Sequence, residues 1–155
     1  MLWWAALAVI GTAIVEWLLV AWRVGTYFRA AFRLPLEPLP VEHPPDGEGQ
    51  TRTVGWEARG EHAVYWSVGG LPGLHGAVGF VPDRGKLRLD VRWAPPWTGV
   101  AGCGALGFVG PSIAPVAVSV TVSVLLLVGL LVLYQQAAVR AAAELRWSWA
   151  RRDED

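Results

Sequence analysis

The sequence predicts an α+β membrane protein in which two transmembrane helices flank a small antiparallel β-unit. A third crossing, or a re-entrant segment, by a short Gly-rich stretch is an open alternative. Two apolar runs, residues 2–22 and 116–134, are long enough to cross a bilayer. Alternating polar and apolar residues between them are typical of strands with one face in water. Charged residues make up 17% of the chain, compared with about 25% in a soluble domain.

Residues 2–22 (LWWAALAVIGTAIVEWLLVAW) are predicted to form the first transmembrane helix. The run would cover about 31 Å, which matches a hydrocarbon core of ~30 Å. A signal peptide is the rival interpretation, but no basic residue precedes the run and no A-x-A motif follows it. We therefore expect an uncleaved helix. Because nothing breaks it before Pro35, we expect it to continue at the headgroup level, giving one segment of residues 2–33.

Residues 34–50 are predicted to form a solvated linker, since they contain five prolines and four acidic residues. Residues 51–93 are the predicted extramembrane β-unit. Polar and apolar side chains alternate in residues 86–93 (KLRLDVRW), so Leu87, Leu89, Val91 and Trp93 should share one face. A unit of about forty residues has a small core. We therefore expect it to lean on the membrane helices, the lipid surface or a partner.

Residues 94–112 form an apolar segment that contains five glycines and no charged side chain. Pro95 and Pro96 disfavour a helix at its start, so the segment is short for a full crossing. Glycine is accepted in membrane helices where another helix packs closely. A re-entrant segment is accepted where protein covers it. The sequence leaves both interpretations open.

Residues 113–151 are predicted to form a transmembrane helix that continues into a charged helical tail, followed by an acidic end at residues 152–155. The apolar part, residues 116–134, would cover about 28 Å. Helix-forming residues predominate beyond it. Ala138, Ala142, Leu145 and Trp149 recur at helical spacing, so they form an apolar stripe along the tail.

The arginines bear on the number of crossings. Arg23, Arg29 and Arg33 follow the first helix, and four further arginines follow the last one. The positive-inside rule places both groups on the cytoplasmic side, which requires three crossings. Two crossings agree better with the length and glycine content of residues 94–112. With either number we expect a multi-pass cell-membrane protein. The abundance of Ala, Gly and Arg suggests a bacterial source and hence the inner membrane.

Four polar residues within the membrane segments are candidate functional groups: Glu16, Thr12, Ser119 and Ser123. A carboxylate in lipid is costly, so Glu16 could handle protons or ions or bind a partner helix. The alternative, which we favour, is an interfacial carboxylate that reaches water, because no second intramembrane ionisable group is present to form a relay. Ser119 and Ser123 have the spacing that lets two helices approach closely.

The sequence contains no motif for catalysis or cofactor binding, so we expect no cofactor. The three histidines and the single cysteine, Cys103, have no metal-site spacing. A net charge of zero gives no support to nucleic-acid binding. Ten tryptophans are present, and several are expected at the membrane–water boundary. Those expected there are Trp22, Trp97, Trp147 and Trp149.

We therefore predict a non-enzymatic integral membrane protein whose β-unit and helical tail bind other proteins or the membrane surface. Its expected partners are the lipid bilayer and either another protein or a second copy of the chain, bound through the membrane helices. The alternative function is that of an accessory subunit of a transporter or channel, with Glu16 facing a polar pathway.

Overall fold

The computed structural model describes residues 2–21, 32–34, 37–39, 43–112 and 114–152. They form an α+β fold with an antiparallel sheet and one long apolar helix. The helices are α1 (Leu2–Ala21), α3 (Trp97–Val109), the 3-10 turn η1 (Gly110–Ser112) and α4 (Val116–Arg152). The chain divides into two compact units, which we describe separately. The helical unit is Met1–Arg23 with Pro95–Tyr134, and the sheet unit is Val24–Ala94 with Gln135–Asp155.

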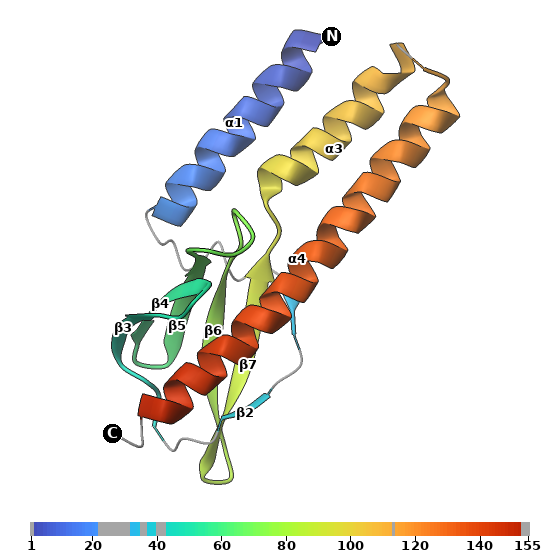
Figure 1. The fold of residues 1–155 in the computed structure, drawn as a ribbon. Helices are drawn as coiled ribbons and strands as arrows, with labels where there is room; N and C mark the ends of the chain where they lie inside the picture. The colour runs from blue at the N-terminus through green and yellow to red at the C-terminus, as the bar shows by residue number, and fades with distance from the viewer. Residues whose placement is uncertain (1, 22–31, 35–36, 40–42, 113, 153–155) are drawn as a thin grey trace. The chain divides into compact units, whose positions relative to one another are not determined.

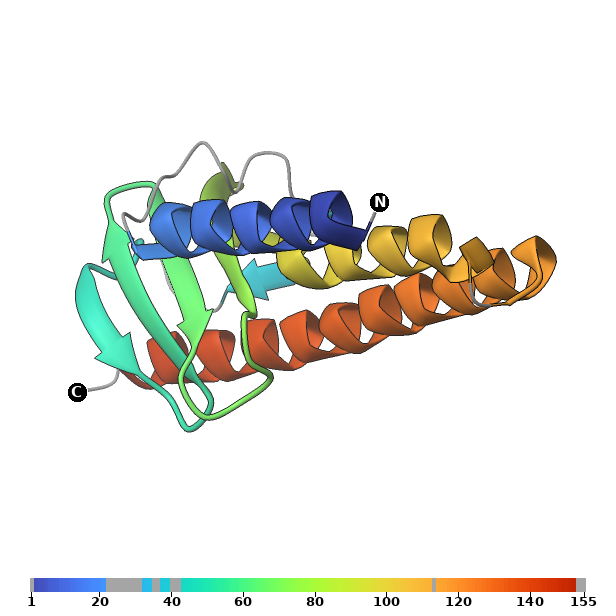
Figure 2. The same cartoon turned by 90° about the horizontal axis from the view of Figure 1, so that it is seen from above.

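In the helical unit, α3 lies beside both α1 and the first part of α4 (Figures 1 and 2). A Cβ at Gly99 would lie 3.2 Å from Leu130, one at Gly107 would lie 3.1 Å from Ser123, and one at Gly110 would lie 2.7 Å from Ser119. The residue number of the contacted α4 residue decreases from 130 to 119 as that of the glycine increases from 99 to 110. The two segments therefore run antiparallel. A Cβ at Gly110 would force Ser119 to shift, whereas at Gly99 and Gly107 the facing side chain would have to move only slightly. Small residues at these positions let side chains of α4 pack closely.

One described helix, Val116–Arg151, is long and apolar enough to cross a membrane. Only 6% of its most apolar 18-residue stretch is buried inside the protein. A second helix of this kind, which the sequence predicted, is not shown within the described residues. The apolar stretch found in α1 is the shorter one of Trp3–Leu19. The sequence left a crossing and a re-entrant segment open for residues 94–112. Ala94 ends the strand β7, and residues 97–112 form α3 and η1.

The sheet unit contains seven strands in the order β1-β7-β6-β5-β4-β3, and β2 also pairs with β7. All of these pairings are antiparallel. The strands are β1 (Phe32–Arg33), β2 (Glu37–Leu39), β3 (Gly47–Gln50), β4 (Val54–Arg59), β5 (His62–Ser67), β6 (His75–Asp83) and β7 (Lys86–Ala94). Strands β6 and β7 form an antiparallel hairpin.

Two expectations for the chain before residue 51 were wrong. Phe32 and Arg33 do not end a helix but form β1, and the predicted linker contains β2 and β3. The long strand β7 needs a partner along its outer side, and the chain supplies one whose Leu34 and Leu39 are buried. Pro38 is acceptable in β2 because an edge strand leaves some backbone groups outside the ladder. Residues 22–31, on which the rest of the helix prediction falls, lie outside the described residues.

The predicted alternation in β7 is confirmed, since Leu87, Leu89, Val91 and Trp93 are all buried. The predicted apolar stripe on the tail is buried too. The second part of α4 packs on the sheet, with Trp149 of the stripe against Trp56 of β4 (Figure 1). The ring of Trp149 makes edge contacts with Trp56 at 5.5 Å and with Phe80 at 5.4 Å between centroids. The tail of the same chain therefore completes the core of the small sheet.

Gly76 of β6 is a position where a side chain does not fit. A Cβ there would lie 2.1 Å from the carbonyl oxygen of Arg92 and 2.5 Å from the hydroxyl of Tyr65. That hydroxyl donates a hydrogen bond to the same carbonyl at 3.2 Å. We expect Gly76→Ala to lower the free energy of unfolding of the sheet unit by about 3 kcal/mol, because the strands must separate to admit the methyl group.

The matched control for this substitution is Gly79→Ala on the same strand. A Cβ at Gly79 would lie 3.7 Å from Asp90, an ordinary contact, so the change should stay within about 0.5 kcal/mol. Urea denaturation of the full chain in detergent, followed by near-UV circular dichroism, measures both variants. Equal losses would show that Gly76 is not specifically constrained.

Candidate functional site

The carboxylate of Glu16 caps the start of α3. Its Oε1 accepts a hydrogen bond from the backbone N–H of Trp97 at 2.7 Å. Its Oε2 accepts from the backbone N–H of Thr98 at 2.9 Å and from the Thr98 hydroxyl at 2.6 Å. The N-cap residue of α3 is Pro96, which makes no side-chain capping bond. Glu16 therefore supplies, from another helix, the acceptor that a Ser, Thr, Asp or Asn would supply at the N-cap.

This cap satisfies backbone N–H groups at the start of α3. The first backbone N–H groups of a helix have no partner within the helix, and an apolar environment makes them costly to leave unpaired. A negative charge at this end also interacts favourably with the helix dipole. The sequence suggested that Glu16 handles protons or ions, binds a partner helix, or lies at the interface and reaches water. The hydrogen bonds between α1 and α3 correspond to the second of these. The sequence did not show the cap, because the bonded residues are 81 and 82 positions away.

The other polar candidates of the apolar helices make hydrogen bonds or packing contacts within the helical unit. The hydroxyl of Thr12 donates to the carbonyl of Ala8 in its own helix at 2.8 Å. The hydroxyl of Ser123 donates to the backbone carbonyl of Cys103 on α3, and Ser119 packs against Gly110. The Ser119 hydroxyl is buried and has no hydrogen-bond partner among the described residues. The two serines thus lie at the α3–α4 contact, as their spacing predicted.

A polar clamp joins the tail to the sheet. The Glu144 carboxylate accepts hydrogen bonds from the hydroxyls of Thr51 and Thr53, each at 2.8 Å, and from the Thr53 backbone N–H at 3.3 Å. Burial raises the pKa of Glu144. The Thr51 and Thr53 bonds and the nearby charge of Arg52 outweigh burial, so the pKa lies below its ordinary value. The sequence did not predict this clamp, because Thr51 and Glu144 are 93 positions apart.

The clamp predicts a dependence of stability on pH. The pKa of Glu144 is lower in the folded chain, so the unfolded chain binds more protons as pH falls below the ordinary value of 4.5. The stabilisation is therefore full above pH 4.5 and is lost as pH falls through the folded pKa. We expect Glu144→Gln to lose stability less steeply than the parent chain below that pH. Urea denaturation at a series of pH values tests this, and identical pH profiles would contradict it.

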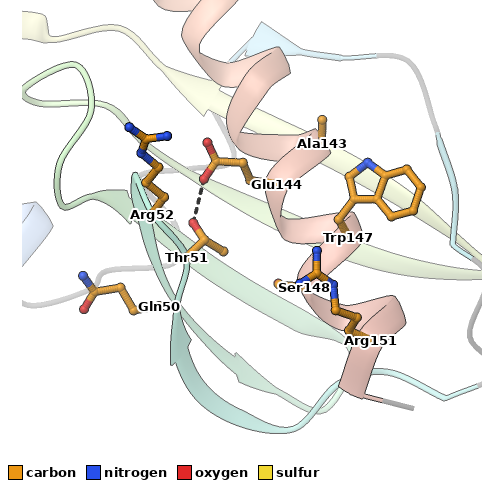
Figure 3. Close-up of a pocket in the computed structure, with 8 residues that line it drawn as sticks. All are labelled: Gln50, Thr51, Arg52, Ala143, Glu144, Trp147, Ser148 and Arg151. Atoms are coloured by element: carbon orange, nitrogen blue, oxygen red, sulfur yellow. Dashed lines mark hydrogen bonds between the residues drawn. The ribbon is translucent and has the colours of Figure 1, made fainter. Parts of the chain in front are cut away.

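A pocket of 850 Å³ lies beside this clamp, between the β3–β4 connection and the tail helix (Figure 3). We call it the tail pocket. It is lined by Gln50, Thr51, Arg52, Ala143, Glu144, Trp147, Ser148 and Arg151. Arg52 and Arg151 form no ion pair with any residue that the structure describes. The side chain of Trp147 is 66% exposed. The tail pocket therefore combines two arginines, of which Arg52 lies near enough to Glu144 to lower its pKa, with an exposed tryptophan.

A charged cluster lies on the sheet face opposite the tail. The Asp90 carboxylate is bound by both Nε and an Nη of Arg33 at 2.6 Å, and by Arg92 at 3.0 Å. The hydrogen bond from Arg33 is the main cause that lowers the pKa of Asp90, against burial, which raises it. The Arg33–Asp90 contact joins β1 to β7, whereas Arg92 lies on the same strand as Asp90. The cluster is therefore explained by the structure of the sheet edge.

The four tryptophans predicted at the membrane boundary have different positions. Trp97 begins α3 and is half-buried, whereas Trp147 is exposed on the tail. The expectation for Trp149 was wrong, because this side chain is only 1% exposed and belongs to the core of the sheet unit. Its position on the apolar stripe, which faces the sheet, is the reason. Trp22 lies outside the described residues.

Within the described ranges, no group of three or more His, Cys, Asp and Glu residues could hold a metal ion. His75 is buried, and its Nδ1 lies 2.7 Å from the carbonyl oxygen of Gly73, while Cys103 is half-buried in α3. No protein-family model, curated protein or solved structure matches the chain. Two features thus carry the functional argument, namely the Glu16 cap and the tail pocket.

Proposed function

We propose that the chain is a three-pass integral membrane protein that presents its sheet unit on the arginine-rich side of the membrane as a protein-binding module of a larger assembly. The observation that carries the proposal is the order of helix ends in the helical unit. Glu16, near the end of α1, caps the start of α3, and Gly99 near that start lies against Leu130 of α4. The chain therefore leaves α1, enters α3 and leaves the apolar part of α4 at one end.

This order of helix ends supports three crossings. The sheet strands and the tail then emerge on the same side, and the N-terminus and the α3–α4 connection lie on the other. Arg23, Arg29 and Arg33 come out on the side of the four tail arginines, so the positive-inside rule is satisfied by both groups. Two crossings would leave one group on the wrong side.

Exposed apolar side chains support a lipid environment for the helical unit. Large apolar residues are more than half exposed on all three helices, including Trp3, Phe108 and Leu125. A surface of this kind in water would favour aggregation or association. The 13 residues of α3 cover about 20 Å, less than a hydrocarbon core of ~30 Å. The start of α3 then lies below the membrane surface, which explains why it needs the Glu16 carboxylate.

A structural role for Glu16 is favoured over a role in a polar pathway. Both carboxylate oxygens accept hydrogen bonds from α3, and no second charged group is present in the apolar segments to form a relay. We therefore place the partner-binding role in the sheet unit. Its tail pocket leaves charged and aromatic groups uncovered.

Photo-crosslinking in native membranes tests the binding role. A photoreactive residue at the exposed Val81 or Trp147 of the sheet unit should give a discrete protein adduct, while the same residue at the exposed Phe108 of α3 should react with lipid. The absence of a protein adduct at both sheet positions, together with a monomeric chain in mild detergent, would contradict the proposal.

A further inference from the structure

We propose that the tail pocket binds an extended segment of a partner protein that carries a carboxylate beside an apolar side chain. The inference rests on the proposed function, because it specifies the partner chemistry of the same sheet unit. Three features support it: the charge of the pocket, its exposed aromatic ring and the strand that ends in it.

The charges of the pocket favour an anionic ligand. Arg52 and Arg151 line it without an ion pair to any described residue, and Glu144 is the one acidic group that lines it. The oxygens of Glu144 are bound by Thr51 and Thr53. Among the described lining residues, two arginines stand against one carboxylate, and their planar guanidinium donors match a carboxylate ligand.

The exposed ring of Trp147 favours a ligand that also carries an apolar group. Trp147 lies thirteen positions beyond Tyr134 on one continuous helix, so it is about 20 Å along the helix axis from the end of the apolar stretch. In the proposed topology lipid does not cover it, yet its side chain is 66% exposed. Tryptophan and arginine are the residues enriched where protein partners bind most strongly.

The sheet provides a backbone template next to the pocket. Gln50, which lines the pocket, is the last residue of β3, and β3 is the end strand of the sheet order. An extended peptide can pair with an edge strand through its backbone, while pockets beside the strand select its side chains. An extended segment fits this arrangement better than a nucleic acid, for which a broad basic surface would be expected.

The test uses the full chain in lipid nanodiscs and a fluorescein-labelled Val-Thr-Val-Asp peptide with a free carboxyl end. The matched probe is Val-Thr-Val-Asn with an amidated end. Fluorescence anisotropy should show saturable binding of the acidic peptide at concentrations below about 1 mM. We expect the double variant R52Q/R151Q to weaken it at least tenfold, W147A to weaken it as well, and R140Q to leave it unchanged. Arg140 is an exposed arginine of α4 that does not line the pocket.

Three results would overturn the inference: no saturable binding, equal binding of the neutral probe, or equal binding by R52Q/R151Q. Tighter binding of an octauridine oligonucleotide, lost in the same double variant, would assign the pocket to nucleic acid instead. Unchanged near-UV circular dichroism shows that each variant is folded. The measurement does not depend on the number of crossings, so failure of the peptide inference and failure of the topology are separate results.

Discussion

Glu16→Ala is expected to lower the free energy of unfolding of the helical unit by about 3 kcal/mol. The substitution removes three hydrogen bonds to a charged acceptor, and such bonds contribute roughly 1.5–3 kcal/mol each without being additive. The N–H groups of Trp97 and Thr98 would then lack a partner in an apolar environment. Glu16→Gln keeps one carbonyl acceptor, so its loss should be smaller. Unfolding in mixed detergent micelles, followed by helical circular dichroism, measures the change.

The matched control is Thr12→Ala, one turn earlier on α1. Thr12 bonds only to its own helix, so the change should stay within about 0.5 kcal/mol. Cys103 of α3 gives a second readout, because it is the single cysteine of the chain. Its rate of reaction with a maleimide should rise in Glu16→Ala and not in Thr12→Ala. Equal stability and equal reactivity in both variants would refute the cap.

Trp149→Ala is expected to lower the free energy of unfolding of the sheet unit by about 4 kcal/mol. The ring is 1% exposed and packs against Trp56 and Phe80, so its loss removes both apolar burial and aromatic contacts and leaves a large cavity. Because α4 is one helix, the tail should remain helical while it separates from the sheet. Urea denaturation followed by near-UV circular dichroism measures the loss.

Trp147→Ala is the control on the same helix, two positions away. Its side chain is 66% exposed, so stability should change by less than about 0.5 kcal/mol. Comparable destabilisation by the two variants would mean that the tail does not dock through the predicted stripe. This comparison also separates the core tryptophan from the one that we assign to partner binding.

Local patterns predicted much of the sheet unit. The alternation in residues 86–93 identified β7 and its buried face, because a strand with one wet face has a period of two. The stripe of Ala138, Ala142, Leu145 and Trp149 marked the buried side of the tail, because helical neighbours recur every three or four residues. The spacing of these residues did not predict that the stripe packs against the sheet, where Trp149 contacts Trp56 and Phe80.

The edge strands were beyond local prediction. Phe32 and Arg33 follow an apolar helix without a breaking residue, so the helical interpretation extended over them. Their strand conformation depends on pairing with Trp93 and Arg92, which are sixty positions away in the sequence. The prolines of residues 34–50 predicted a linker, although proline is also tolerated in an edge strand, where Pro38 lies. In both places tertiary pairing outweighs local preference.

The candidate sites were predicted only as residue types. The sequence identified Glu16 as an unusual carboxylate in an apolar run. Its donors, two backbone N–H groups and the Thr98 hydroxyl, are 81 and 82 positions away, so local patterns did not reveal them. The clamp of Glu144 and the tail pocket depend on the docking of the tail against the β3–β4 connection. A helix start without an N-cap residue, here Pro96-Trp97-Thr98, is the one sequence signal that could have suggested an external cap.

Cysteine accessibility in sealed membranes tests the three-crossing topology most directly. Cys103 is first replaced by serine, and single cysteines are placed at Gln50, Ser112 and the exposed tail residue Ala143. A membrane-impermeant maleimide should label Gln50→Cys and Ala143→Cys from the same side, and Ser112→Cys from the opposite side. Labelling of Gln50→Cys and Ser112→Cys from one side, with Ala143→Cys on the other, would mean two crossings and would contradict the account.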